Sequence, residues 1–483
     1  MVTPALPQVP EAASPDVGGQ AFSTLPLGQP WLDNLAQLDY RQMTAIQART
    51  LPLMLAGKDV LGQAGTGTGK TAAFGLALLA RITPGGDRPG ALVLCPTREL
   101  AAQVADELRR LARPLAHTKV LTLCGGTSVS RDRASLDHGV DVVVGTPGRV
   151  LDHLTRARLH LDAVATLVLD EADRMLEMGF IDAVTTIARA APTTRQTLLF
   201  SATFPDPVRA LSAQFQRDAI HVEVPPDAST TPVAQLVYDI GPLARPAALT
   251  RILGHHRPDS AVVFCNQRET CDVLAEALTA AGHSAVALHG GMAQHDRDTV
   301  LLLLRNGTLR LLIATDVAAR GLDIDDLAAV INYELPRDAA GYIHRIGRTA
   351  RAGRTGLAIS LVGPADRHAL DDLRAGPLAG VTSSPVAALS STRARSAPPT
   401  MVTIAIQGGR RDKLRPGDIV GALTTAIGLA AADIGQIHIL DRLTFVALTA
   451  AAAPRAHAGL AHGQIKKRRF RSYLVTIPTA PRA

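Results

Sequence analysis

Two short segments of this chain hold the residue types that phosphate chemistry requires, in the order in which that chemistry uses them. The first reads Ala64-Gly65-Thr66-Gly67-Thr68-Gly69-Lys70-Thr71, and the second reads Asp170-Glu171-Ala172-Asp173. A glycine-rich loop of the first kind presents backbone N–H groups and a lysine to the β- and γ-phosphates of a nucleotide. The second segment follows the apolar run 165–169, which is typical of a buried strand, so its carboxylates lie at a strand end. Together the segments predict an ATPase.

Each of these side chains has a distinct expected role. Lys70 offers a positive charge to the β- and γ-phosphate oxygens, and Thr71 offers a hydroxyl to Mg²⁺. Asp170 is expected to reach Mg²⁺ through water, because this ion dehydrates reluctantly. Glu171 is expected to orient the attacking water and to take its proton. The sequence therefore predicts metal-assisted hydrolysis at the end of one strand.

Length and composition limit the class of protein. A chain of 483 residues is too long for one ordinary core, and 47% hydrophobic residues suffice for two or three packed domains. No apolar stretch is long and clean enough to span a bilayer, and residues 1–20 lack the basic start and apolar core of a signal peptide. We therefore expect a cytoplasmic protein with a disordered N-terminal tail. The four cysteines, none in a CxxC pair, are expected to be buried free thiols.

The net charge of +7 is unevenly distributed. From Met401 onward there are 12 Lys and Arg against 4 Asp and Glu, whereas the first 400 residues hold 38 basic against 39 acidic residues. The whole basic excess therefore lies in the last sixth of the chain. A basic terminal domain on a neutral ATPase body indicates a nucleic-acid anchor, and a solubilising charged tail is the alternative.

Apolar runs separated by helix-length segments divide the chain into three folded parts. The first two alternate strands with helices, the pattern of a doubly wound parallel sheet, and the third follows the order β-α-β-β-α-β of an RNA-recognition-type fold. The expected fold class is therefore α/β with a small C-terminal α+β domain. The expected boundaries are 1–20 (tail), 21–223, 224–233 (linker), 234–379, 380–399 (linker), 400–478 and 479–483 (tail).

Further motifs accompany the two phosphate-handling segments in a fixed order, and with them the chain resembles the DEAD-box RNA helicases over residues 22–375. They are Pro96-Thr97-Arg98-Glu99-Leu100-Ala101, Thr146-Pro147-Gly148-Arg149, Ser201-Ala202-Thr203 and His344-Arg345-Ile346-Gly347-Arg348-Thr349-Ala350-Arg351. The resemblance implies two RecA-like domains, ATP and Mg²⁺ as cofactors, RNA as partner and ATP-dependent RNA unwinding. ATP and RNA together are expected to close the two domains over the site.

The resemblance also assigns roles in adenine binding. Gln47 would select adenine, since an amide pairs with adenine N6 and N7, and Tyr40 would stack on the ring. Phe22 matches an isolated upstream aromatic of the family. The motif departs from the family pattern where glycine and two prolines are usual, at Asp39, Met43 and Ala45. These departures affect the shape of the loop rather than the adenine contacts.

In the second domain the resemblance assigns Asp323 to the ribose, and Arg348 and Arg351 to the γ-phosphate as arginine fingers. Guanidinium groups suit that role because they stay charged and grip phosphate bidentately. Coupling between the domains is assigned to Asp173, Ser201, Thr203 and His344. The alternatives are a solvated helix cap for Asp173 and an ordinary surface patch for the arginines.

The RNA contacts that the resemblance implies are made to the backbone. They fall on Pro96, Thr97, Arg98, Gly125, Gly126, Thr146, Pro147, Gly148 and Arg149 in the first domain, and on His289, Gly290, Gln294, Arg297, Thr315 and Arg320 in the second. Glycines and helix N-termini let backbone amides approach phosphates closely, and such contacts read no bases. The core is therefore expected to bind RNA with little sequence preference, although the two glycines also suit a plain turn.

Sequence preference must then come from the C-terminal domain, which resembles that of the DbpA branch of the family. This implies engagement of 23S rRNA, or of the large ribosomal subunit precursor, during late subunit assembly. Phe445 and Tyr473 are the only strand aromatics, so base stacking across the sheet is not expected. Structured RNA is expected to be held through its backbone and shape by Arg410, Arg411, Lys413, Arg415, Lys466, Lys467, Arg468 and Arg469.

Other functions stay open at this point. A generic DEAD-box helicase, or an ATP-gated RNA clamp acting on other RNAs, would carry the same motifs, and a strand-displacement assay separates unwinding from clamping. A translocating DNA helicase would lack RNA-stimulated ATPase activity and prefer a DNA tail. A binding protein with a silent ATPase is disfavoured by the intact motifs. The sequence indicates no membrane association and no obligate protein partner.

Overall fold

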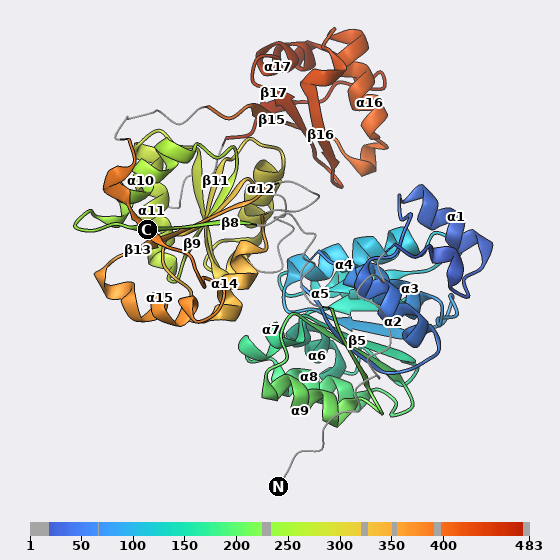
Figure 1. The fold of residues 1–483 in the computed structure, drawn as a ribbon. Coiled ribbons are helices and arrows are strands. Elements are labelled where there is room, and N and C mark those ends of the chain that lie inside the picture. The colour runs from blue at the N-terminus through green and yellow to red at the C-terminus, as the bar shows by residue number, and fades with distance from the viewer. Residues whose placement is uncertain are drawn as a thin grey trace. The chain divides into compact units, whose positions relative to one another are not determined.

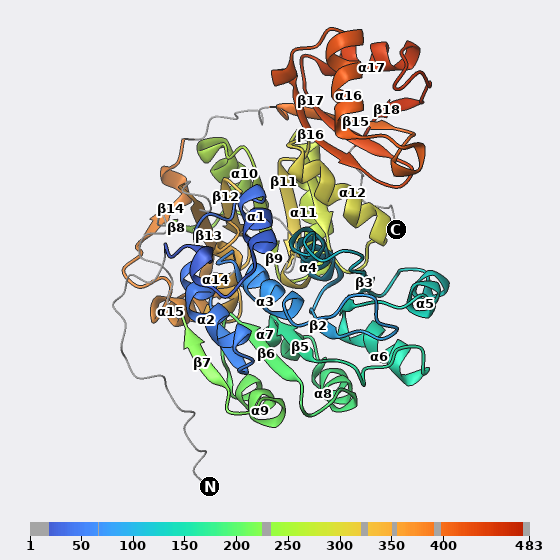
Figure 2. The same ribbon diagram turned by 90° about the vertical axis from the view of Figure 1, so that its right-hand side faces the viewer.

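A computed structural model describes residues 19–65, 67–224, 233–319, 327–349, 355–390 and 398–476 (Figures 1 and 2). The described residues form two compact units, an N-terminal one within 19–224 and a C-terminal one that begins at 233. Most of the expected tails and of the first linker lie outside the described residues, as do Thr66, Arg320, Asp323 and Arg351. Within the described ranges, no helix is both long enough and apolar enough to cross a membrane.

The N-terminal unit is built on a seven-stranded parallel sheet of order β3-β4-β2-β5-β6-β1-β7. Its central strands are continuous apolar runs, as expected for a parallel sheet covered on both faces. Successive side chains point to opposite faces, so Leu92 and Val93 belong to different cores. The strands are β1 (Val60–Gln63), β2 (Ala91–Leu94), β3 (Val120–Leu123), β4 (Val142–Gly145), β5 (Thr166–Asp170), β6 (Gln196–Ser201) and β7 (Ile220–Glu223).

Helices cover both faces of this sheet (Figure 1). One face carries α1 (Gln29–Gln37), α2 (Ala45–Leu55), α3 (Lys70–Leu79) and α4 (Arg98–Leu111). The other carries α6 (Pro147–Thr155), α7 (Ala172–Glu177), α8 (Ile181–Ala190) and α9 (Asp206–Phe215), while α5 (Val129–Asp137) follows β3. Because the strands are parallel, the loops after their carboxyl ends open at one sheet edge, where the phosphate and RNA motifs lie.

The C-terminal unit contains a second seven-stranded sheet, of order β10-β11-β9-β12-β13-β8-β14 and again parallel. Its strands are β8 (Ala234–Asp239), β9 (Ala261–Cys265), β10 (Ala285–Leu288), β11 (Leu311–Thr315), β12 (Ala329–Asn332), β13 (Leu357–Val362) and β14 (Ser383–Pro385). Its helices are α10 (Arg245–His256), α11 (Arg268–Ala280), α12 (Gln294–Arg305), α13 (Asp316–Ala319), α14 (Ala339–Ile346) and α15 (Arg367–Arg374).

Strand β14 lies within the segment 380–399 that the sequence indicated as a linker. It pairs with β8 at the edge of the sheet, and the following Val386 and Leu389 are buried in the core of this domain. Because these two apolar side chains are buried, the segment packs against this domain instead of serving as a linker to the last domain. The first part of the expected linker therefore belongs to this domain, and residues 391–397 lie outside the described residues.

The last domain has a four-stranded antiparallel sheet of order β16-β17-β15-β18. Ile404 and Val446 pack with Ile419 and Leu460 of the two helices. The elements are β15 (Met401–Ile406), α16 (Pro416–Gly421), β16 (Ile434–Ile439), β17 (Thr444–Thr449), α17 (Ala453–His462) and β18 (Ser472–Leu474). The expected fold class, two parallel-sheet α/β domains followed by a small α+β domain, is confirmed.

All four cysteines are free and buried, as the sequence predicted. Burial raises the pKa of the Cys95 thiol well above its usual value and that of Cys124 to about 11. These thiols therefore stay protonated at neutral pH and pack as small apolar side chains.

Candidate nucleotide and RNA sites

The glycine-rich loop between β1 and α3 needs glycine for its backbone shape. Gly67 and Gly69 have positive φ angles of 75° and 89°, and a Cβ on Gly69 would lie 2.5 Å from Gln47 Nε2. Lys70 begins α3 and is buried, and its Nζ donates to the carbonyl of Ala64 at 2.7 Å. The loop thus gathers a lysine and the N–H groups of a helix N-terminus, an arrangement that binds phosphate.

Gln47 and Thr44 join the start of α2 to this loop. Gln47 is only 1% exposed; its Oε1 accepts from the backbone N–H of Thr44 at 2.9 Å, and its Nε2 donates to the carbonyl of Gly69 at 3.1 Å. The Thr44 hydroxyl donates to the carbonyl of Thr68 at 2.7 Å. These hydrogen bonds therefore fix the position of Gln47, the residue assigned to adenine, relative to the phosphate loop. Sequence reasoning missed Thr44, although Thr44-x-x-Gln47 has the spacing of a capping box.

The two aromatic residues assigned to this region lie side by side. The rings of Phe22 and Tyr40 meet edge to face with centroids 6.2 Å apart, and the Tyr40 hydroxyl donates to Glu107 Oε1 at 2.7 Å. Burial and this hydrogen bond raise the pKa of Tyr40 well above its usual value. Asp39, at the position where the resemblance expects glycine, has a φ of 63°. Asp39 therefore adopts the left-handed backbone conformation that glycine would adopt here, but with backbone strain that glycine would not have.

Asp170, the last residue of β5, is a buried carboxylate. It is 3% exposed, and its Oδ1 has no hydrogen-bond partner among the described residues. Burial raises its pKa to about 7, against the opposing effect of the Lys70 ammonium. A divalent cation would satisfy this group, since carboxylate oxygens are preferred ligands of Mg²⁺. The residues present therefore fit a Mg²⁺ ion held by Asp170 together with the hydroxyl of Thr71.

Glu171 has a strained backbone. It precedes α7 with φ 52° and ψ 55°, a left-handed conformation that is rare for residues other than glycine. Such a conformation costs roughly 1–2 kcal/mol. Strain of this kind persists where the surrounding structure imposes it, and it gathers at active sites. The backbone thus agrees with the catalytic role expected of Glu171.

Asp173 joins the ends of β5 and β6. Its Oδ2 accepts from the backbone N–H of Thr203 at 3.1 Å and from the Thr203 hydroxyl at 2.8 Å, and its own N–H donates to Ser201 Oγ at 3.2 Å. The carboxylate is buried rather than solvated. A shift in either loop would therefore be transmitted to the other.

Three of the segments assigned to RNA meet in the N-terminal unit. The turn at Gly125-Gly126 lies against Arg98 of α4, and its flanking residues accept hydrogen bonds from Arg149 of α6. A Cβ on Gly126, which has a φ of 77°, would lie 2.1 Å from Arg98 Nη1, so a larger residue there would strain the backbone and displace the tip of Arg98. Thr97 and Thr146 precede α4 and α6, whose N-termini favour anions. The remaining assigned residues of these segments are Pro96, Pro147 and Gly148.

In the C-terminal unit the residues assigned to RNA lie at the carboxyl ends of adjacent strands. Thr315 ends β11, and His289 follows β10, with its Nε2 2.9 Å from Asp272 Oδ1. The other described members are in the same stretch and are Gly290, Gln294 and Arg297. Adjacent parallel strands end at one edge, so this group shares one side of the domain.

Arg345, which sequence reasoning passed over, lies at the centre of a buried network at the same edge. All five of its N–H groups have acceptors, provided by Asp316, Asn332, Asn266 and the carbonyl of Glu334. The two bonds to Asp316 are each 2.7 Å long. Arg345 therefore anchors α14, which carries His344 and leads into the buried Arg348.

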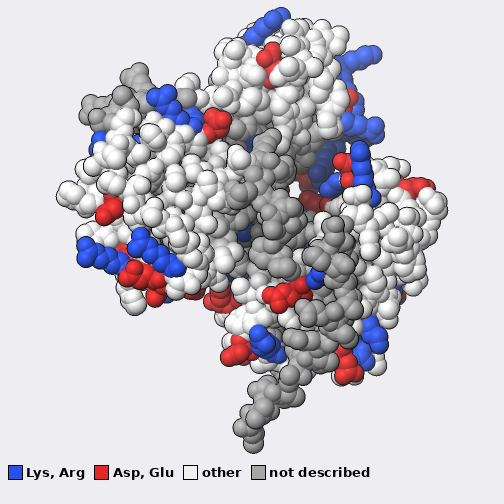
Figure 3. Space-filling model, viewed as in Figure 1, with Lys and Arg blue, Asp and Glu red and all other residues white. Residues whose placement is uncertain are grey.

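The two basic segments of the last domain lie next to each other. Arg468 pairs with Asp412 at 2.9 Å, and Lys466 pairs with Asp418 at 2.9 Å and donates to the carbonyl of Lys413 at 2.8 Å. Basic side chains gather along the edge of the domain that carries α16 (Figure 3). The other expected side chains are exposed and are those of Arg410, Arg411, Lys413, Arg415, Lys467 and Arg469. The fold thus combines two separate stretches of sequence into one basic surface.

The strand aromatics of this domain share one face of the sheet. Phe445 and Tyr473 both lie opposite Ala405, on its two sides. Tyr473 is 43% exposed, but Phe445 only 7%. One accessible ring is a small stacking platform, so backbone contacts remain the expected mode of RNA binding.

Known proteins resemble the chain in all three of its folded parts. The DEAD/DEAH box helicase family matches residues 44–211, the helicase conserved C-terminal domain matches 244–353, and the DbpA RNA binding domain matches 403–473. The chain is 48% identical to the ATP-dependent RNA helicase DbpA of Escherichia coli over 459 residues, covering 94% of this chain and 99% of that protein.

Other relatives match a smaller share of the chain. The DEAD-box ATP-dependent RNA helicase CshA of Geobacillus kaustophilus is 43% identical over 344 residues, which cover 71% of this chain and 73% of CshA. The solved structure of S. cerevisiae Dbp5 bound to RNA and ADP BeF3 matches with a TM-score of 0.69 at 32% identity, covering 76% of this chain and 96% of Dbp5. The chain therefore belongs to the DEAD-box ATP-dependent RNA helicases and, with its DbpA RNA binding domain, is close to DbpA.

Proposed function

We propose that this helicase remodels 23S rRNA, or the large ribosomal subunit precursor, during large-subunit assembly in the cytoplasm. The observation that carries the proposal is the basic surface of the last domain, where an ion pair and a hydrogen bond join loop 410–415 to turn 465–468. The RNA contacts expected of the helicase domains read no bases, so this domain is the one able to select an RNA. Backbone and shape recognition suits folded RNA.

ATP hydrolysis drives the remodelling, and each residue of the phosphate site has a proposed part in it. Lys70 and the N-terminus of α3 hold the β- and γ-phosphates, and Asp170 with Thr71 holds Mg²⁺. Bound Mg²⁺ supplies charge neutralisation at the phosphates. Glu171 orients the attacking water and accepts its proton. Charge that develops on the γ-phosphate is stabilised by guanidinium groups of the second helicase domain, Arg348 and Arg351.

RNA selectivity tests the proposal. ATPase activation would be titrated with a 23S rRNA fragment and with poly(A), for the full chain and for a chain that ends at Ser390 and so keeps β14 in its sheet. We expect the full chain to prefer the 23S rRNA fragment and the shortened chain to respond weakly and equally to both. Equal selectivity of the two proteins would overturn the proposal and favour a helicase or RNA clamp that acts on other RNAs.

A charge reversal narrows the test to the basic surface. Arg410→Glu with Arg411→Glu is expected to remove most of the preference and to lower the salt dependence of activation, because each phosphate contact releases about one counterion. The control is Arg367→Glu with Arg374→Glu on α15, which changes the net charge equally in the helicase domain. A similar loss in the control would mean that total charge, rather than this surface, attracts the RNA.

A further inference from the structure

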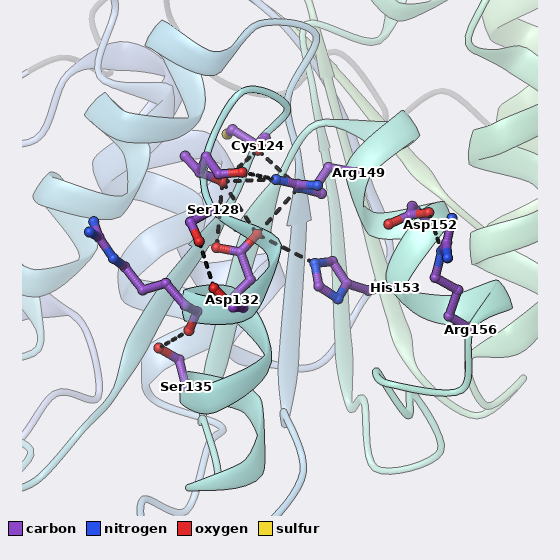
Figure 4. Close-up of polar contacts among 11 residues, drawn as sticks. Cys124, Ser128, Asp132, Ser135, Arg149, Asp152, His153 and Arg156 are labelled. Carbon is purple, nitrogen blue, oxygen red and sulfur yellow. Dashed lines mark hydrogen bonds and ion pairs between the residues drawn. The ribbon is translucent and has the colours of Figure 1, made fainter.

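A buried carboxylate lies beneath two of the segments assigned to RNA. Asp132, in α5, is 4% exposed and accepts from the Thr127 hydroxyl at 3.3 Å. Its Oδ2 is 3.3 Å from Arg149 Nε and 3.4 Å from His153 Nε2 (Figure 4). None of these acidic and imidazole groups has a part in the ATPase chemistry described above. The carboxylate thus connects the glycine turn after β3 with the first turns of α6.

Arg149 faces this carboxylate and the loop rather than solvent. Its Nε donates to the carbonyl of Cys124 at 3.1 Å, and its Nη2 donates to the carbonyl of Thr127 and lies 3.2 Å from the Thr127 hydroxyl. Its side chain is 11% exposed. These bonds grip the residues on both sides of Gly125-Gly126. The arginine is therefore placed to set the shape of the loop, with its charge balanced by Asp132.

His153 completes the group from the second turn of α6. It is fully buried, and its Nε2 faces Asp132, so the geometry favours the tautomer with the hydrogen on Nε2. Its Nδ1 has no hydrogen-bond partner among the described residues. The imidazole therefore orients the Asp132 carboxylate toward Arg149, and its other nitrogen does not bond a further described residue.

We propose that Asp132 and His153 are positioning residues for RNA binding. They hold Arg149 so that the loop 124–127 and the N-terminus of α6 stand at a fixed spacing, suited to consecutive phosphates of one strand. Neither side chain touches RNA. The inference rests on the proposed assignment of these two segments to RNA, and it adds the buried group that sets their geometry.

The experiment measures poly(A) activation of the ATPase in the full chain. Asp132→Asn keeps the size of the side chain and removes its charge. We expect the half-activating concentration of poly(A) to rise about tenfold, with kcat at saturating RNA and the KM for ATP within about twofold of the wild type, as for loss of one charge-assisted bond. Asp152→Asn is the control, because Asp152 lies in α6 and its carboxylate pairs with the exposed Arg156 at 2.7 Å (Figure 4).

A pair of His153 variants separates positioning from packing. Gln at this position retains a side-chain N–H donor for Asp132, whereas Leu fills the space without one. We expect His153→Gln to stay within about threefold of the wild-type half-activating concentration and His153→Leu to resemble Asp132→Asn. Melting temperatures identify variants that fail to fold. Loss of stability with an unchanged half-activating concentration in Asp132→Asn and His153→Leu would mean that the group only supports the fold, and would overturn the inference.

Gly126→Ala distinguishes failure of this inference from failure of the proposed RNA assignment. If Gly126→Ala leaves the half-activating concentration unchanged, then the loop does not bind RNA and both ideas are overturned. If Gly126→Ala raises the concentration while Asp132→Asn does not, then only the positioning role is overturned.

Discussion

The phosphate loop of the N-terminal unit and the basic surface of the last domain are both suited to phosphate groups, by opposite means. Lys70 and Asp170 are buried, and each has few neighbouring polar groups. Arg410, Arg411 and Lys467 are exposed to solvent. A charge in a dry interior interacts strongly with its few neighbours, while an exposed charge is screened and interacts weakly with many. We infer that hydrolysis depends on single residues and that anchoring depends on a sum of charges.

The largest effect is expected at Glu171. Glu171→Gln should lower ATP turnover by about 10²- to 10⁴-fold, because the amide cannot accept a proton from the attacking water. ATP and RNA binding should persist, and both are measured by fluorescence titration. The control Asp182→Asn changes an exposed acid of α8. Near-normal turnover in Glu171→Gln would contradict the inference that hydrolysis depends on single residues.

The next effect concerns pH and Asp170, whose pKa burial raises to about 7. Between about pH 4 and 7 the native state holds this proton more tightly than the unfolded chain does, so the nucleotide-free protein should lose stability as pH rises through that range. Mg²⁺ needs the ionised carboxylate. The kcat/KM for ATP should therefore fall about tenfold per pH unit below 7. A kcat/KM that is level from pH 5.5 to 8 would contradict the burial argument.

Gln47→Ala should weaken ATP binding about tenfold and relax discrimination against GTP, because the bidentate contact with adenine is lost. The loss of its bonds to Thr44 and Gly69 should add to the effect. The KM values for ATP and GTP are the measurement, with Gln37→Ala on α1 as control. Equal use of GTP and ATP by the wild type would show that Gln47 does not read the base.

Gly126→Ala should weaken activation by RNA about five- to tenfold, since the new Cβ would displace Arg98, and should also cost about 1 kcal/mol in stability. Gly179→Ala is a matched control: Gly179 also has a positive φ, of 76°, but a Cβ there meets nothing within 4 Å. Both variants carry the backbone cost, which thermal melting measures. Equal RNA activation in the two would mean that the Gly125-Gly126 turn does not bind RNA.

The smallest effect is expected on the exposed surface. Lys467→Gln should raise the half-activating concentration of a 23S rRNA fragment only about twofold and should lower the slope of its logarithm against the logarithm of salt concentration by roughly 0.7 to 0.9. A loss of tenfold or more from this single exposed charge would show that the basic surface, too, depends on individual residues.

The parts of the site that the sequence predicted are local in the chain. The loop 64–71 and the segment 170–173 follow apolar runs directly, so their position at strand ends could be inferred. Arg345 could not be found in this way, because its acceptors come from the ends of separate strands. The same holds for Asp132, whose partners Arg149 and His153 lie on another helix. Strand β14, with the sequence Ser-Ser-Pro, has no strand pattern and forms by pairing at a sheet edge.

The four buried cysteines have a practical consequence for studies of motion. Thiol reagents attack the exposed thiolate, so cysteines that are buried within a core react slowly with maleimides. Dyes should therefore label cysteines that are introduced at exposed positions, and the four native cysteines need not be replaced. Exposed positions such as Asp182 of α8 and Arg367 of α15 would carry a donor and an acceptor, one in each compact unit. Energy transfer between them could follow an ATPase cycle in a protein whose cores are otherwise unchanged.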